Sequence, residues 1–123
     1  MQRREIVLGE YLIRQDEKPD MIYFIESGQV TAQMESPDHP PMRLETMRGV
    51  NLVGEVGFYL GVKRTAAVIV DQPNVVYCLS TLNLANLENS EPEAASIFHR
   101  IVAHFLGERV AHLTQVTNAL ERT

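Results

Sequence analysis

Short apolar runs separated by turn signals fill the first two-thirds of the chain. Residues 21–25 form one such run, and after the turn signal Glu26-Ser27-Gly28 the residues 30–34 alternate between apolar and polar side chains. This pattern predicts two strands joined in a hairpin. Further strands are expected at residues 43–47, 51–53, 64–70 and 75–79. Many short strands at this spacing are typical of a β-barrel or β-sandwich rather than of alternating βαβ units.

Two segments between these runs predict connections. Residues 35–42 contain three prolines and show no periodicity, so we expect a surface loop there. Residues 71–74, with the sequence Asp-Gln-Pro-Asn, form a turn signal between the last two strands. The sequence therefore predicts a region rich in short strands that ends near Ser80.

Helical periodicity replaces the strand pattern after Ser80. Residues 80–89 predict a short helix. The next residues have the pattern of a capping box, in which Ser90 accepts a hydrogen bond from the backbone of Glu93 and the Glu93 side chain reaches back. Few helix breakers follow before Leu120, so one long helix of up to about eight turns is expected.

Apolar residues recur along this long helix at alternating steps of four and three. Such a seam favours a second helix packing alongside, which would make the chain a dimer, although it spans only about two heptads. The alternative is that the seam covers the barrel or a part of the protein outside this sequence. The seam consists of Leu106, Val110, Leu113, Thr117 and Leu120.

Composition narrows the class of protein. A length of 123 residues predicts one domain, and the net charge of −5 argues against a nucleic-acid surface, which needs an excess of Lys and Arg. Cys78 is the only cysteine, so there is no disulfide framework, and a reducing cytoplasmic setting fits best. No apolar run approaches the roughly 20 residues of a membrane-spanning helix. The first residues do not resemble a signal peptide.

Four of the seven glycines (49, 54, 57 and 61) lie in one neighbourhood of the sequence. Glycine lets the backbone approach a ligand closely, and a short helical turn flanked by glycines directs several N–H groups at one spot, which suits an anion. Arg64 follows and adds a planar fork of donors for phosphate oxygens. The segment 53–67 therefore predicts a binding site for a phosphate.

Glu55 lies inside this segment, and it would repel a phosphate. It needs a hydrogen-bond donor, and a sugar hydroxyl is the obvious candidate, so the pair predicts a phosphate beside a ribose. The alternative is an internal ion pair between Glu55 and Arg64 across a tight loop. A nucleotide-hydrolysing P-loop is excluded, because no Lys followed by Ser or Thr comes after the second glycine.

Residues 53–67, with the sequence Val-Gly-Glu-Val-Gly-Phe-Tyr-Leu-Gly-Val-Lys-Arg-Thr-Ala-Ala, resemble the phosphate-binding cassette of the cyclic-nucleotide-binding domain family. Residues 8–30 resemble the opening strands of that family, so the similarity covers nearly the whole chain. The resemblance implies a mainly β fold with C-terminal helices: a jelly-roll-like β-roll (double-stranded β-helix) of about eight strands, then a short and a long helix. A single domain is expected, with the β-roll at 1–80 and the helices at 81–123.

The same resemblance implies roles for individual residues. Glu55 matches the glutamate that binds the ribose 2′-hydroxyl, and Arg64 matches the arginine that pairs with the cyclic phosphate. Most of the remaining matches line the phosphate and ribose. One lies where relatives touch the base. A threonine after the arginine is associated in some relatives with cyclic GMP binding. These residues are Gly54, Val56, Gly57, Thr65, Ala66 and, for the base, Leu44. No catalytic or metal-binding residue and no cofactor are implied; the ligand expected is cyclic AMP or cyclic GMP.

The resemblance also has implications for the parent protein and for the part of the chain that moves on ligand binding. The long helix is expected to fold over the base as a lid. Residues 91–122 together with the cassette are similar to a domain at the end of some bacterial sulfate-permease-family (SulP) transporters, which would tether this domain at the inner membrane. One departure from the family pattern is Val50, where relatives usually have glycine, with Gly49 one place earlier.

Other classes of function fit the sequence less well. Three histidines, His99, His104 and His112, fall on the long helix at separations of five and eight, which does not place two metal ligands on one face. Cys78 is expected in the core, and no nucleophile has a recognisable base, so we expect no enzyme. The remaining alternatives are a β-roll that has lost its ligand and serves dimerisation or protein interaction, and the effector domain of a transcription regulator. No nucleic-acid contact by this fragment is expected.

Overall fold

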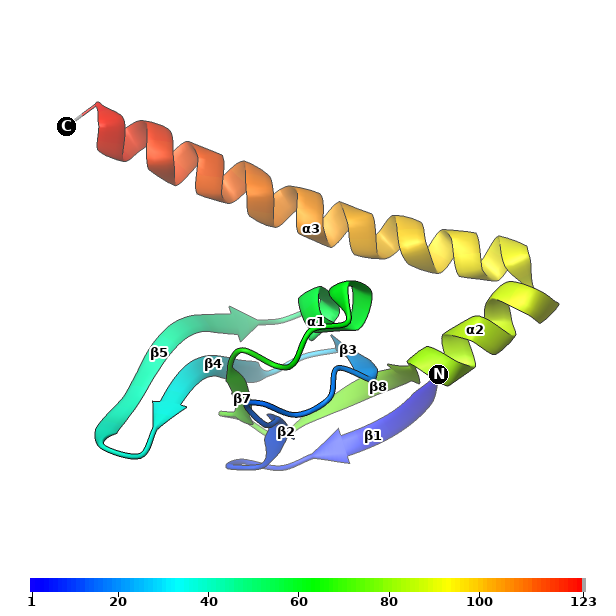
Figure 1. Ribbon diagram of the computed structural model, residues 1–123, viewed down its shortest axis with the longest axis horizontal. Helices are drawn as coiled ribbons and strands as arrows, with labels where there is room; N and C mark the ends of the chain where they lie inside the picture. Colours follow the sequence, from blue (N-terminus) through cyan, green and yellow to red (C-terminus); the bar gives the residue numbers. More distant parts are fainter. Residues whose placement is uncertain (123) are drawn as a thin grey trace. The chain divides into compact units, whose positions relative to one another are not determined.

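The computed structural model describes residues 1–122 and shows a β-roll followed by two helices (Figure 1). The strands are β1 (Gln2–Ile6), β2 (Tyr11–Ile13), β3 (Met21–Ile25), β4 (Gln29–Ser36), β5 (His39–Arg48), β6 (Asn51–Val53), β7 (Ala67–Val70) and β8 (Asn74–Ser80). The helices are α1 (Glu55–Leu60), α2 (Thr81–Ser90) and α3 (Pro92–Glu121). This architecture confirms the predicted β-roll with a short and a long helix after it.

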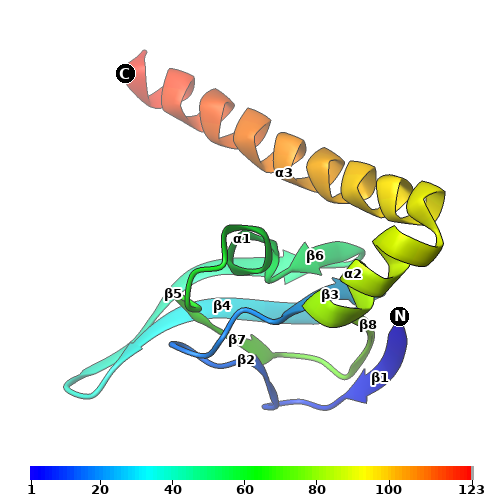
Figure 2. The ribbon, with the colours of Figure 1, turned by 45° about the vertical axis from the view of Figure 1, so that its right-hand side comes forward.

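Two four-stranded antiparallel sheets form the roll (Figure 2). The strand order is β1-β8-β3-β6 in the first sheet and β2-β7-β4-β5 in the second. Both sheets contribute alternate side chains to one hydrophobic core, as expected for a sandwich. The core consists of Ile6, Leu12, Ile13, Tyr23, Ile25, Val30, Met47, Val53, Val68, Val70, Val76 and Cys78. Cys78 is therefore buried in the core as predicted.

The predicted hairpin between residues 21–25 and 30–34 is wrong. β3 pairs with β6 and β8, whereas β4 pairs with β5 and β7, so the two strands belong to different sheets. The turn at Glu26–Gly28 carries the chain from one sheet to the other. The turn residues reverse the chain but do not determine its pairing: β3 has partners distant in sequence on both sides, and β4 lies between its sequence neighbour β5 and the distant β7.

The surface loop predicted at residues 35–42 is also wrong in most of its length. β4 continues to Ser36 and β5 begins at His39, so only two residues form the turn. The resulting hairpin extends beyond the rest of its sheet (Figure 2). Pro40 and Pro41 are accommodated because β5 is an edge strand, where a missing N–H need not break the ladder.

The capping box predicted at Ser90 is not formed. Ser90 is the last residue of α2, and its hydroxyl donates to the carbonyl of Asn86 at 2.9 Å. α3 begins at Pro92 after the N-cap residue Glu91, without a side-chain capping bond. A serine hydroxyl can bond back to its own helix four residues earlier, and here that bond competes successfully with capping.

The chain divides into two compact units, Met1–Leu84 and a second that begins at Ala85. Within the second unit, the predicted long helix is confirmed as α3. Its seam residues Val110, Leu113 and Leu120 are each more than 60% exposed in the described chain. The seam's packing partner therefore stays a prediction. In the described residues, no helix combines the length and the apolar character needed to cross a membrane.

Candidate ligand-binding site

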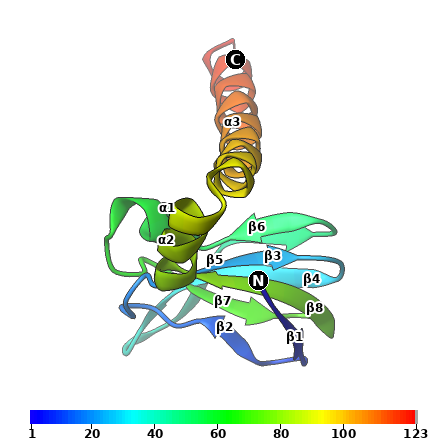
Figure 3. The ribbon, with the colours of Figure 1, turned by 90° about the vertical axis from the view of Figure 1, so that its right-hand side faces the viewer.

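The cassette residues form the short helical turn that the glycines predicted. Gly54 precedes α1 with a φ of 87°, and Gly61 follows it with a φ of 69°. Both values lie in the left-handed region, which glycine adopts without strain. Glu55 is the first residue of α1 and is only 4% exposed. Figure 3 shows α1 beside the strands of the roll rather than among them.

Arg64 is buried beside this helix and is held from several directions. Its Nη1 donates to the carbonyl of Gly54 at 2.7 Å, and its Nη2 donates to the carbonyl of Met21. Its backbone N–H donates to the carbonyl of Glu17 at 3.0 Å, and its own carbonyl accepts from the N–H of Asp16 at 2.8 Å. Arg64 is thus fixed by backbone carbonyls rather than by a carboxylate, and it joins the cassette to the start of β3.

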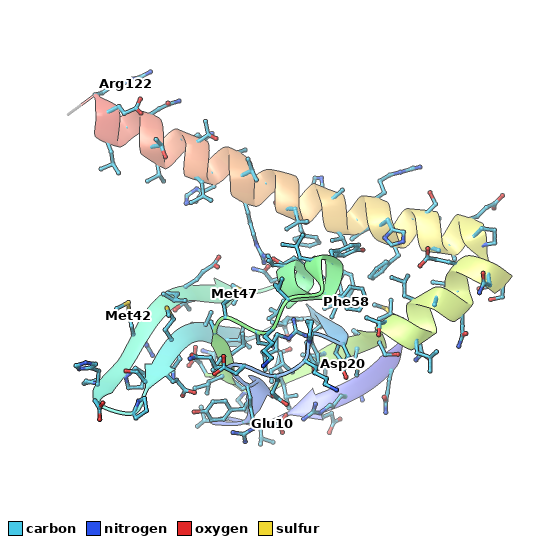
Figure 4. All side chains as sticks on the ribbon, viewed as in Figure 1. Glu10, Asp20, Met42, Met47, Phe58 and Arg122 are labelled. Atoms are coloured by element: carbon cyan, nitrogen blue, oxygen red, sulfur yellow. The ribbon has the colours of Figure 1, made fainter. Side chains whose placement is uncertain are left out.

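Opposing effects act on the pKa of the Arg64 guanidinium. Burial lowers the pKa of the Arg64 guanidinium, while Tyr23, Asp20 and Glu17 raise it. Asp20 lies directly before β3 in the unit that carries the cassette (Figure 4). An arginine stays protonated under such opposing influences, because its unperturbed pKa lies far above neutral pH. The site therefore holds a permanent positive charge on a buried residue, where its attraction for an anion is stronger than in water.

Two glycines leave the space that the guanidinium occupies. A Cβ at Gly54 would lie 2.9 Å from Arg64 Nη1. A Cβ at Gly57 would lie 2.9 Å from the Cβ of Pro19 and 3.2 Å from Arg64 Nη1. These distances are shorter than ordinary van der Waals contacts. Any side chain at either glycine would therefore displace Arg64 or its surroundings, which explains why glycines precede this arginine.

The other predicted site residues lie on three different segments of the chain. Val56 lies on the exposed side of α1, and Thr65 and Ala66 follow Arg64 directly before β7. Leu44 lies on β5, two strands from β7, and is 51% exposed. No direct contact between Leu44 and the cassette is shown, so its contact with a base stays a prediction.

Sequence reasoning missed two contributors to the site. Met21 supplies a backbone carbonyl to Arg64, and Pro19 bounds the space beside Gly57. A backbone acceptor has no side-chain signature, so no sequence signal could have identified Met21.

The structure also accounts for the departure from the family pattern at Val50. Gly49 takes the left-handed conformation with a φ of 68°, and its N–H donates to the carbonyl of Gly28 at 3.0 Å, so the glycine turn is displaced by one residue.

The three histidines of the predicted long helix belong to the second compact unit. His99, His104 and His112 all lie on α3, and His104 Nε2 is 2.7 Å from Glu108 Oε1. Among residues 1–122, no group of three or more His, Cys, Asp or Glu side chains is placed to hold a metal ion. The chemistry that the site offers is that of a fixed cation next to a buried carboxylate.

Comparison with known proteins identifies the family. The sequence model of the cyclic nucleotide-binding domain matches residues 3–91, which includes the whole cassette, β2 to β8 and all of β1 except Gln2. This chain belongs to the cyclic nucleotide-binding domain family. The family assignment confirms the resemblance noted from the cassette.

Individual relatives are consistent with this assignment. The Cyclic GMP-binding protein C of Dictyostelium discoideum is 28% identical over 105 residues, which cover 85% of this chain and 4% of that protein. A cyclic nucleotide-binding domain from Methylobacillus flagellatus has the same fold, with a TM-score of 0.81 at 18% identity over 90% of this chain and 62% of that one. The regulatory domain of Toxoplasma gondii PKA in complex with cAMP gives a TM-score of 0.63 at 23% identity, over 85% and 39% of the two chains.

Proposed function

We propose that this chain is a regulatory module that binds cyclic AMP or cyclic GMP. The observation that carries the proposal is Arg64, a residue that is 7% exposed and whose guanidinium is held beside Gly54 and Met21 by two of its five N–H groups. The remaining N–H groups suit the oxygens of a cyclic phosphate. The buried carboxylate of Glu55, nine residues earlier, suits the ribose 2′-hydroxyl.

The other cassette residues complete the proposed site. The backbone of Gly54, Val56 and Gly57 lines the phosphate and ribose, and Thr65 and Ala66 adjoin the phosphate. Two relatives support a cyclic nucleotide as the ligand: one is named a cyclic GMP-binding protein, and the other was crystallised with cAMP. In this proposal the domain uses no metal or cofactor and catalyses no reaction; it reports occupancy.

We also propose which longer protein the domain belongs to and how it assembles. The domain regulates a longer, cytoplasm-facing protein, and a sulfate-permease-family transporter is the candidate that its helical region resembles. A homodimer formed through the α3 seam is the proposed means of assembly. The competing function is a nucleotide-insensitive interaction module.

Calorimetric titration with cyclic AMP, cyclic GMP and their 2′-deoxy analogues tests the proposal. The wild-type chain is expected to bind both cyclic nucleotides saturably and the 2′-deoxy forms more weakly. Glu55→Ala should weaken cyclic AMP binding far more than 2′-deoxy binding, because the deoxy form lacks the hydroxyl that Glu55 accepts from. Absence of binding by the wild-type chain would favour the interaction module, and equal losses for both ligands would give Glu55 a structural role only.

A further inference from the structure

The loop that joins β2 to β3 contains a left-handed residue that is not a glycine. Asp16 has a φ of 68°, and among residues 1–122 no other residue except glycine has a positive φ. A residue with a side chain is strained in this region, although aspartate tolerates it better than most. Such strain persists only where the surrounding structure imposes it, and it is found most often at functional sites.

Two residues of this loop, Asp16 and Glu17, lie opposite the single residue Arg64. The N–H of Asp16 donates to the carbonyl of Arg64 at 2.8 Å, and the N–H of Arg64 donates to the carbonyl of Glu17 at 3.0 Å. This is the bonding pattern of a β-bulge whose first residue is left-handed, a position that glycine usually occupies. Bulges redirect side chains and are common next to active sites. Here the residue opposite the bulge is the arginine of the proposed phosphate site.

The turn before the bulge requires the same conformation of Asp16. The N–H of Glu17 donates to the carbonyl of Arg14 at 3.3 Å, and Glu17 Oε1 accepts from the N–H of Arg14 at 2.9 Å. Asp16 is the third residue of this four-residue turn, where a positive φ is typical of a type II turn and favours glycine or asparagine. The Asp16 side chain is exposed, and among residues 1–122 it makes no hydrogen bond or ion pair. What Asp16 contributes is therefore its backbone conformation.

We propose that Asp16 is a positioning residue for the phosphate site, because its left-handed backbone fixes the backbone of Arg64 and so the direction of the guanidinium. The inference rests on the proposed cyclic-nucleotide function. The carbonyls of Gly54 and Met21 hold the far end of the Arg64 side chain, and the bulge holds its near end. A loop that leaves the left-handed conformation breaks both bulge bonds. Apparent affinity then falls in proportion to the fraction of molecules that keep the competent conformation.

Calorimetric titration of two Asp16 variants with cyclic AMP and cyclic GMP tests this inference. Alanine is poorly tolerated in the left-handed region, so Asp16→Ala should weaken the binding of both nucleotides about threefold to tenfold. Asparagine tolerates this region as aspartate does, so Asp16→Asn should bind within about twofold of wild type although it lacks the charge. Equal losses in the two variants would assign the effect to the carboxylate and overturn the inference.

Gly9→Ala controls for a general loss of stability. Gly9 has a φ of 84°, and a Cβ there meets nothing within 4 Å, so alanine adds backbone strain without crowding. Its N–H donates to the carbonyl of Val70 rather than to Arg64. Urea denaturation should show Gly9→Ala destabilised at least as much as Asp16→Ala, because glycine carries no strain at that φ, while its affinity stays that of wild type. A loss of affinity in Gly9→Ala equal to that in Asp16→Ala would replace positioning with general destabilisation.

The Nε–H resonance of Arg64 gives a readout that does not depend on ligand, and Arg64→Lys identifies it by removing it from the NMR spectrum. Asp16→Ala should shift or broaden this resonance in the free chain, whereas Asp16→Asn and Gly9→Ala should leave it in place. An unchanged resonance or wild-type affinity in Asp16→Ala overturns the inference while the proposed function stands. Binding of neither nucleotide by the wild-type chain removes the proposed function, and the resonance alone then decides whether Asp16 positions Arg64.

Discussion

Arg64 has a structural role in addition to its proposed contact with a phosphate. Its guanidinium supplies the donors for the carbonyls of Gly54 and Met21, which lie in segments far apart in the sequence. A buried carbonyl that loses its donor costs about 1–3 kcal/mol. Substitution of Arg64 therefore lowers stability as well as affinity, and the two effects require separate measurements.

The glycine at position 57 is predicted to matter because of the space it leaves. Gly57→Ala places a Cβ 2.9 Å from Pro19 and 3.2 Å from Arg64 Nη1, at a glycine without positive φ, so crowding is the only new strain. We expect the free energy of unfolding to fall by about 1–3 kcal/mol, as for other overpacked sites, and nucleotide affinity to fall with it.

Gly107→Ala is the matched control for Gly57→Ala. Gly107 also lies in a helix without positive φ, but a Cβ there meets nothing within 4 Å. Alanine should stabilise α3 by up to about 1 kcal/mol. Urea denaturation of both variants checks the pair, and equal stability of Gly57→Ala and wild type would contradict the crowding argument.

At the scale of elements, local patterns predicted six of the eight strands, β3 to β8, but not their pairing. The periodicity of residues 21–25 and 30–34 identified β3 and β4 correctly, because alternation reflects which side of a strand is buried. Their separation into two sheets depends on partners such as β7 and β8, which lie more than 30 residues away and leave no local signal. The prolines at residues 37–41 likewise led to the prediction of a loop where the β4–β5 hairpin continues. An edge strand tolerates proline, whereas a central strand does not.

The candidate site was predictable to a similar degree. The spacing of Glu55 and Arg64 identified the two charged groups, because a site for a phosphate and a ribose hydroxyl needs a cation and a carboxylate at suitable positions. The carbonyl of Met21 and the role of Pro19 were not predictable, since they arise from the path of the backbone in three dimensions.

Ser90 provides a prediction at the same scale. Because its hydroxyl bonds back to Asn86 and does not cap α3, Ser90→Ala should change the free energy of unfolding by less than about 0.5 kcal/mol, as for an ordinary surface position. A lost N-cap costs about 0.5–2 kcal/mol, typically near 1. Thermal or urea unfolding measures the difference, and a loss of about 1 kcal/mol or more would mean that Ser90 caps the long helix in solution.

At the scale of the whole molecule, the proposed function requires one part of the chain to respond to the ligand. A closely packed core deforms little, and a ligand shifts a conformational equilibrium only if it contacts the two states differently. The second compact unit, which begins at Ala85 and contains α3, is the candidate for the responding part. Its exposed seam would pass the response to a partner subunit or to an attached domain.

Hydrogen exchange with and without cyclic nucleotide tests this response. We expect ligand to protect residues 53–67, where it binds, and also to change the protection of residues 92–120, because α3 is the proposed lid. Protection confined to residues 53–67, with α3 unchanged at saturating ligand, would make this domain a passive binder.

The central claim is that Arg64 binds the phosphate of a cyclic nucleotide, and calorimetric titration of Arg64→Ala tests it most directly. Removal of one partner from a buried charge pair costs about 2–5 kcal/mol, so affinity should fall roughly thirtyfold or more. Arg3→Ala removes an arginine from an exposed pair on β1 and should bind as wild type does. Thermal melts establish that each variant is folded at the temperature of titration. A folded Arg64→Ala variant that binds cyclic nucleotide as tightly as wild type would contradict the account.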